Sequence, residues 1–73
     1  MIHFTKYAEE KFEILNKYQV YFTREQVEEA VMLPDKVGKK GAYKTARKEG
    51  IKVVYRKEGE VIRVVTFYPV KIK

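Results

Sequence analysis

Tyrosine and arginine residues recur through the second half of this chain, and both residue types can act on phosphodiesters. A tyrosine hydroxyl can transfer protons, and an arginine guanidinium can stabilise the charge that develops on a phosphorane. Tyr43, Arg56 and Arg63 therefore make a candidate catalytic set for cleaving RNA without a metal. Lysine and arginine also neutralise backbone phosphates. The predicted nucleic-acid-binding residues are Arg47, Lys52, Arg56, Arg63 and Lys44.

The positive charge of the chain is concentrated in the same half. Residues 1–35 carry four basic and seven acidic side chains, a net charge of −3, whereas residues 36–73 carry twelve basic and three acidic ones, a net charge of +9. Such asymmetry points to a polyanionic partner, although a solvated, lysine-rich surface gives the same composition. RNA or the ribosome is the partner that we expect.

Composition disfavours other kinds of site. The chain has no cysteine and a single histidine, His3, so it lacks thiol nucleophiles, and His3 has no second metal ligand at a useful spacing. We expect no cofactor and no metal.

No segment approaches the roughly 18 apolar residues of a membrane span, so we expect a cytoplasmic protein without a membrane partner. Charged residues make up 36% of the chain, a bias common in heat-adapted proteins, which predicts a thermophilic source.

Two helices are predicted in the first half of the chain. Apolar residues from Ala8 to Leu15 recur at spacings of four and three, which is typical of one buried helix face and predicts a helix over residues 6–18. Thr23 begins a capping box, and a proline follows the next apolar stripe, which predicts a second helix over residues 24–33.

The second half predicts an antiparallel meander. Lys48-Glu49-Gly50 and Lys57-Glu58-Gly59 are near-identical turn sequences nine residues apart, and each can close a β-hairpin. The predicted strands cover residues 42–48, 51–57 and 60–68, with residues 2–4 as a candidate edge strand and residues 35–41 as a loop. The predicted fold is therefore a single α+β domain over residues 1–73, with two N-terminal helices packed on a three- to four-stranded antiparallel sheet.

Two-residue turns at Glu49-Gly50 and Glu58-Gly59 would give the sheet two distinct faces, because side chains alternate along a strand. They would set Arg47 opposite Lys52 and Arg56 opposite Val61. The helix-facing set is then mostly apolar: Ala42, Ala46, Ile51, Val53, Tyr55, Ile62, Val64, Thr66 and Tyr68. The opposite face, which we call the basic set, includes four cations. Its members are Tyr43, Thr45, Arg47, Lys52, Val54, Arg56, Val61, Arg63, Val65 and Phe67. A three-residue turn would instead shift one strand and exchange its faces.

Short motifs along nearly the whole chain resemble those of a known family. They run from Ile2 to Glu9, from Thr23 to Val27 with Leu33-Pro34-Asp35 after it, and from Arg63 to Pro69. In these motifs the chain resembles domain-of-unknown-function family 4258, which is itself similar to the RelE/ParE toxin superfamily. The resemblance implies a helical pair on a curved antiparallel sheet, and a toxin–antitoxin system with an acidic antitoxin protein as partner. Some superfamily members cut messenger RNA on the ribosome with basic and aromatic residues of the sheet, and others act on DNA gyrase.

Three functions stay open at this point. The first is a toxin-like, RNA-directed domain that acts as a metal-independent endoribonuclease. The second is a non-catalytic module that binds RNA or a protein. The third is a structural or vestigial protein without affinity for nucleic acid. The residue pattern does not indicate an oligomeric state.

Overall fold

The computed structural model describes residues 2–70, which form two helices and five strands. The helices are α1 (Lys6–Lys17) and α2 (Arg24–Met32). The strands are β1 (Ile2–Phe4), β2 (Lys36–Lys40), β3 (Tyr43–Lys48), β4 (Ile51–Glu58) and β5 (Val61–Pro69). Neither of the helices described has the length and apolar character needed to cross a membrane.

Both helices begin where the sequence predicts, because a threonine caps each of them. The Thr5 hydroxyl accepts a hydrogen bond from the backbone N–H of Ala8 at 3.1 Å. Thr23 and Gln26 form the predicted capping box, in which each side chain accepts from the other residue's backbone N–H. Each helix ends within one residue of its predicted end, so both helix predictions are confirmed.

The five strands form one mixed sheet in the order β1-β5-β4-β3-β2. The strands from β2 to β5 are antiparallel neighbours, but β1 pairs with β5 in parallel. The predicted antiparallel sheet of three to four strands is therefore wrong. The parallel pair arises because the chain passes through both helices and three strands before it returns beside β1 as β5.

The strand that the prediction lacked is β2, which lies in the segment expected to be a loop over residues 35–41. All five residues of β2 are exposed, so backbone hydrogen bonds to β3 hold this strand rather than burial of apolar side chains. Three lysines and a glycine give it no alternating apolar pattern. Lysines on an edge strand also discourage pairing with another chain, which accounts for this composition.

The β4–β5 turn lies one residue later than predicted, at Gly59 and Glu60. Gly59 has a positive φ of 63°, a conformation that glycine adopts without steric cost. Because of the later turn, Arg56 lies opposite Arg63 and not opposite Val61. A register change of two residues keeps the predicted faces in this half of the hairpin, since side chains alternate with a period of two.

A β-bulge in β5 exchanges the faces of the second half of that strand. The pairing of β4 with β5 shifts register between Val54 and Tyr55, which leaves Val65 as an extra residue in β5. Beyond the bulge, Phe67 is fully buried in the core, and Tyr68 lies on the opposite face. The bulge therefore makes three predicted face assignments wrong: those of Thr66, Phe67 and Tyr68.

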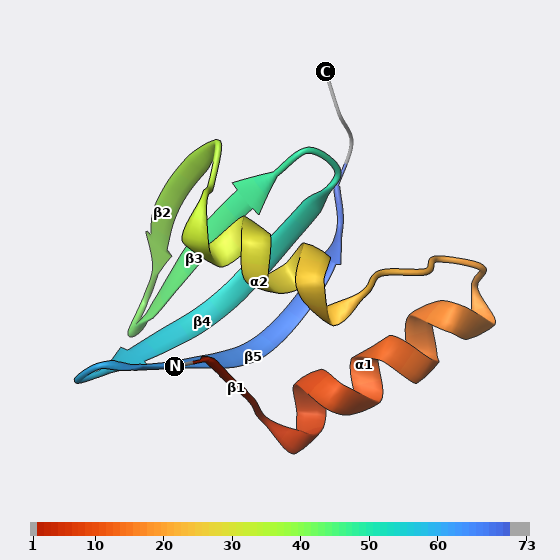
Figure 1. Ribbon diagram of the computed structural model, residues 1–73, viewed down its shortest axis with the longest axis horizontal. Coiled ribbons are helices and arrows are strands. Elements are labelled where there is room, and N and C mark those ends of the chain that lie inside the picture. Colours follow the sequence, from red (N-terminus) through yellow and green to blue (C-terminus); the bar gives the residue numbers. More distant parts are fainter. Residues whose placement is uncertain (1, 71–73) are drawn as a thin grey trace.

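Both helices pack against the sheet around Phe67. The ring centroids of Phe12 in α1 and Phe22 just before α2 lie 4.5 Å and 6.2 Å from that of Phe67. Figure 1 shows α2 lying across β3 and β4, whereas α1 lies beside β5. One cluster of buried residues joins both helices to the sheet: Ala8, Leu15, Val27, Ala30, Val31, Ile51, Val53, Val64 and Phe67.

Substitution of Phe67 tests the bulged register. Phe67→Ala should lower the free energy of unfolding by about 3–5 kcal/mol, because it removes a fully buried ring. Phe67→Leu keeps more apolar volume and should lower it less. Urea unfolding followed by circular dichroism measures both variants. Changes within about 0.5 kcal/mol for both, as at a surface position, would contradict the burial of Phe67.

Candidate functional site

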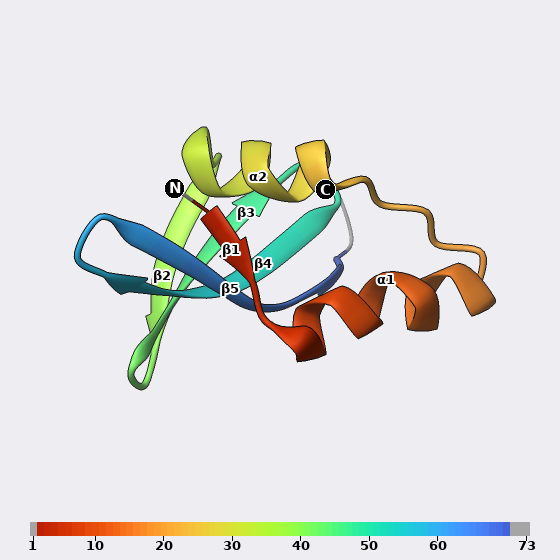
Figure 2. The ribbon, with the colours of Figure 1, turned by 60° about the horizontal axis from the view of Figure 1, so that its bottom comes forward.

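Four of the five predicted nucleic-acid-binding residues lie on the sheet face opposite the helices, which we call the open face. In Figure 2, α2 covers the other face of β3 and β4, and no helix within residues 2–70 lies across this one. Strand pairing aligns the side chains of the open face in rows that cross neighbouring strands. Two of these rows are basic, and the row between them consists of short side chains.

The first basic row crosses β2, β3, β4 and β5 near the β3–β4 turn. Lys36 lies opposite Arg47, which lies opposite Lys52 on the next strand. Lys52 in turn pairs with Tyr68 of β5. The pairing of Arg47 with Lys52 confirms the predicted register of this hairpin. Three cations thus occupy adjacent strands, about 4.8 Å apart, beside an aromatic ring.

The second basic row lies toward the other end of β4. Arg56 pairs with Arg63 of β5, and Arg63 lies opposite His3 of β1. Tyr43 is one residue beyond the last β3–β4 pair, on the Arg56 side, and Lys40 pairs with it from β2. This row therefore contains all three predicted catalytic residues, and Tyr43 is 38% exposed within it.

The row between the two basic rows consists of short side chains. It crosses four strands in the order Gly38, Thr45, Val54 and Thr66. Thr45 and Val54 are buried although they lie on the open face. A Cβ atom placed on Gly38 would lie 3.0 Å from Thr45 Oγ1, so these two residues pack closely. Long basic side chains consequently flank a strip of short ones.

Lys44 is the predicted site residue that the structure separates from the others. It pairs with Lys39 of β2 and with Tyr55 of β4, and Tyr55 packs against the core on the helix-bearing side. Lys44 also lines a shallow hollow on that side with Val37, Gly38, Lys39 and Tyr55. Lys44 and Arg47 are three residues apart on β3, so their side chains lie on opposite faces of the sheet.

One carboxylate lies among the arginines of the open face. A Glu58 oxygen accepts a hydrogen bond from Arg63 Nε at 3.2 Å, and the other oxygen lies 3.5 Å from Arg56 Nε. The three side chains are between 40% and 56% exposed, so water screens these ion pairs strongly. Glu58 was not among the predicted site residues, because the predicted turn included it.

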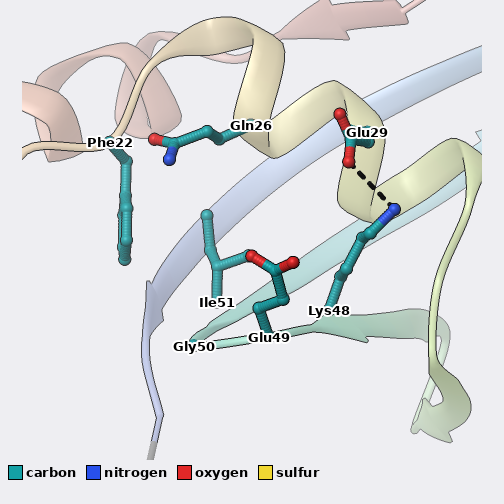
Figure 3. Close-up of a pocket in the computed structure, with 7 residues that line it drawn as sticks. All are labelled: Phe22, Gln26, Glu29, Lys48, Glu49, Gly50 and Ile51. Atoms are coloured by element: carbon teal, nitrogen blue, oxygen red, sulfur yellow. Dashed lines mark ion pairs between the residues drawn. The ribbon is translucent and has the colours of Figure 1, made fainter. Parts of the chain in front are cut away.

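A second hollow lies on the helix-bearing side, between α2 and the β3–β4 turn (Figure 3). Its lining residues are Phe22, Gln26, Glu29, Lys48, Glu49, Gly50 and Ile51. Lys48 Nζ lies 2.9 Å from a Glu29 carboxylate oxygen at one end of the hollow. The hydrogen-bonded Glu29 carboxylate raises the pKa of Lys48 above its ordinary value of 10.5. This ion pair joins β3 to α2 and lies apart from the open face.

The raised pKa of Lys48 predicts how the ion pair depends on pH. Because the pKa is higher in the folded chain, the stabilisation is fully present below the unfolded pKa of 10.5 and is lost as pH rises through the folded value. Lys48→Met should therefore destabilise the protein at pH 7, and the difference from the native chain should shrink above pH 10.5. Urea titrations at several pH values measure it, with Lys57→Met as a control for the charge. A difference that does not change with pH would show that the ion pair is not the cause.

Besides Glu58, four residues of the two basic rows were not among the predicted site residues: His3, Lys36, Lys40 and Tyr68. His3 was accessible to prediction, because it alternates with two apolar residues in a segment predicted as an edge strand. Lys36 and Lys40 share a face only if their segment is a strand, and its composition indicates a loop. Tyr68 reaches the open face only because of the bulge, for which the sequence carries no signal.

Among residues 2–70, no three His, Asp or Glu side chains lie close enough together to hold a metal ion. Comparisons with protein-family models, with curated proteins and with solved structures found no match to this chain. The resemblance to a toxin-like family therefore stays a prediction, and the function has to be argued from the open face itself.

Proposed function

We propose that this chain binds single-stranded RNA through the open face. The observation that supports this proposal is the alignment of two basic rows, each with a tyrosine, across strands that no described helix covers. Cations neutralise phosphates, and aromatic rings on a sheet can stack on unpaired bases. Bases within a duplex are already stacked on one another, so stacking side chains favour a single strand.

The spacing of the rows suits an extended ligand. Lys52 and Arg56 belong to different rows and are four residues apart on β4, which corresponds to about 13 Å along the strand. Thr45 and Val54 lie between the rows and are buried, so a nucleotide chain there would contact the long basic side chains that flank them. A single strand lying there has cations on both sides of it.

Cleavage of the bound RNA is a further part of the toxin-like hypothesis. Tyr43 lies in the same row as Arg56 and Arg63, so a proton-transferring hydroxyl and two guanidiniums face the same side of the sheet. Metal-independent cleavage can use a hydroxyl that takes a proton from the ribose 2′-hydroxyl and guanidiniums that stabilise the charged phosphorane, while water protonates the departing 5′-oxygen. The alternative is a binding module that leaves RNA intact. Incubating the native chain with labelled RNA, and following both binding and cleavage, distinguishes the two.

Charge removal on the two faces tests the binding proposal. The double variants Arg47→Gln/Lys52→Gln and Arg56→Gln/Arg63→Gln should each weaken binding of a labelled single-stranded RNA at least tenfold, because each removes two cations from the open face. Each should also lower the slope of log affinity against log salt by about 1.4, given about 0.7 per phosphate contact on a single strand.

The matched control is Lys44→Gln/Lys57→Gln, which removes the same charge from the helix-bearing side. This control should change the affinity for RNA by less than about threefold. Its two lysines lie on the other side of the sheet from the RNA, and salt screens charges that are more than about a Debye length apart. Equal losses in all three double variants would mean that RNA responds to net charge alone, and would contradict the assignment of binding to the open face.

Two substitutions of Tyr43 separate stacking from acid–base chemistry. Tyr43→Leu should weaken RNA binding about fivefold or more, because base–aromatic stacking is worth about 1–3 kcal/mol per base, whereas Tyr43→Phe keeps the ring and should bind normally. If the native chain cuts RNA through this hydroxyl, Tyr43→Phe should bind but not cut. Gel-shift and cleavage assays on the same samples measure both properties. Unchanged binding by Tyr43→Leu would exclude stacking on this ring.

A further inference from the structure

Glu58 is held by two arginines that the proposed function assigns to RNA. Its carboxylate contacts Arg63 Nε at 3.2 Å and Arg56 Nε at 3.5 Å, one oxygen to each guanidinium. Arg56 and Arg63 are direct partners on neighbouring strands, and Glu58 follows Arg56 by two residues, so all three side chains lie on the open face. The β4–β5 hairpin therefore places a carboxylate where two cations converge.

A carboxylate and a phosphate diester are similar hydrogen-bond acceptors for a guanidinium. Each is an anion with two oxygens that accept N–H hydrogen bonds, and arginine binds both in the same forked geometry. The position of the Glu58 carboxylate thus marks a place where a phosphate group could contact Arg56 and Arg63 together. His3 lies opposite Arg63 on the next strand, at the edge of this place.

The contacts that hold Glu58 are weak enough to be replaced. The side chains of Glu58, Arg56 and Arg63 are 40%, 56% and 49% exposed, and exposed ion pairs contribute little to stability. Glu58 is also the last residue of β4, directly before the Gly59–Glu60 turn. Its side chain can swing into solvent while the hairpin stays intact.

We propose that Arg56 and Arg63 form a binding site for one backbone phosphate of the RNA, and that Glu58 occupies this site as an internal competitor until RNA displaces it. This inference rests on the proposed function, because the ligand is a phosphate of the same single strand. The Glu58 carboxylate lowers the affinity of the Arg56–Arg63 site for an isolated anion. Such an anion has no other contacts with the protein to compensate for displacing Glu58. A strand that also contacts the first basic row can displace Glu58, since its other phosphates contribute binding at the same time.

Glu58→Gln removes the competing charge and is the direct test. It should tighten binding of a labelled single-stranded RNA about three- to tenfold at low salt, as expected from the loss of two exposed ion pairs. Glu10→Gln makes the same change of charge on the exposed surface of α1 and should alter the affinity by less than about twofold. The same Glu58→Gln change in an Arg56→Gln/Arg63→Gln background should have no effect beyond that of Glu10→Gln.

A titration with inorganic phosphate distinguishes failure of this inference from failure of the proposed function. The Nε–Hε signals of Arg56 and Arg63 in nuclear magnetic resonance spectra should shift at lower phosphate concentration in Glu58→Gln than in the native chain. If the arginine signals shift at lower phosphate concentration in Glu58→Gln but neither protein binds RNA, then Arg56 and Arg63 do form an anion site with Glu58 as competitor. The proposed function is wrong in that case. If the native chain binds RNA and Glu58→Gln binds it equally or more weakly, Glu58 orients the arginines instead of competing, and the inference is overturned.

Discussion

The single extra residue in β5, Val65, determines which side chains meet the helices and which meet solvent. Without it, strict alternation would direct Phe67 to the face opposite the helices and Tyr68 toward them. With it, Phe67 lies at the centre of the core, against Phe12 and Phe22, and Tyr68 joins Lys52 on the open face. The bulge thus completes the core and the first basic row together.

The start of α1 is tied to the same bulge. Thr5 caps α1 by accepting from the Ala8 N–H, and its hydroxyl donates to the Val65 carbonyl at 3.3 Å. The Thr5 backbone N–H also donates to the Val64 carbonyl at 3.0 Å, which extends the pairing of β1 with β5. One threonine therefore connects the helix cap, the parallel strand pair and the bulged residue, and a bulge carbonyl that leaves the regular ladder gains a partner.

The fold separates the charges of the chain into two regions. Six of its acidic residues lie on the two helices, and the cations of the two basic rows lie on the opposite face of the sheet. Such a separation gives the molecule a positive side that attracts polyanions over a distance of about a Debye length. Glu58 lies among the arginines of the positive side, which is why its position carries information about the ligand.

Local signals in the sequence predicted the elements that are stabilised locally. The spacing of apolar residues predicted α1, the Thr23 capping box predicted α2, and a two-residue turn predicted the pairing of Arg47 with Lys52. The edge strand β2 was not predictable in this way, because its stability comes from backbone hydrogen bonds to β3. Its lysines give it no alternating apolar pattern, so its composition indicates a loop.

The bulge was also beyond prediction, for a different reason. The second half of β5 is apolar on both faces, so its pattern contains no preference for either alternation. The contacts of the Phe67 ring with Phe12 and Phe22 favour the bulged register. For the candidate site, the consequence was that Arg47, Lys52, Arg56 and Arg63 were assigned to the correct face, whereas Tyr68 was not.

The most direct test of the account is to titrate the isotope-labelled chain with a short single-stranded RNA and to follow its lysine and arginine side-chain signals by nuclear magnetic resonance. If RNA binds the open face, the signals of the cations on that face should shift, and those of Lys44, Lys48 and Lys57 on the other side should stay nearly unchanged. Shifts spread evenly over both faces, or shifts confined to the helix-bearing side, would contradict it.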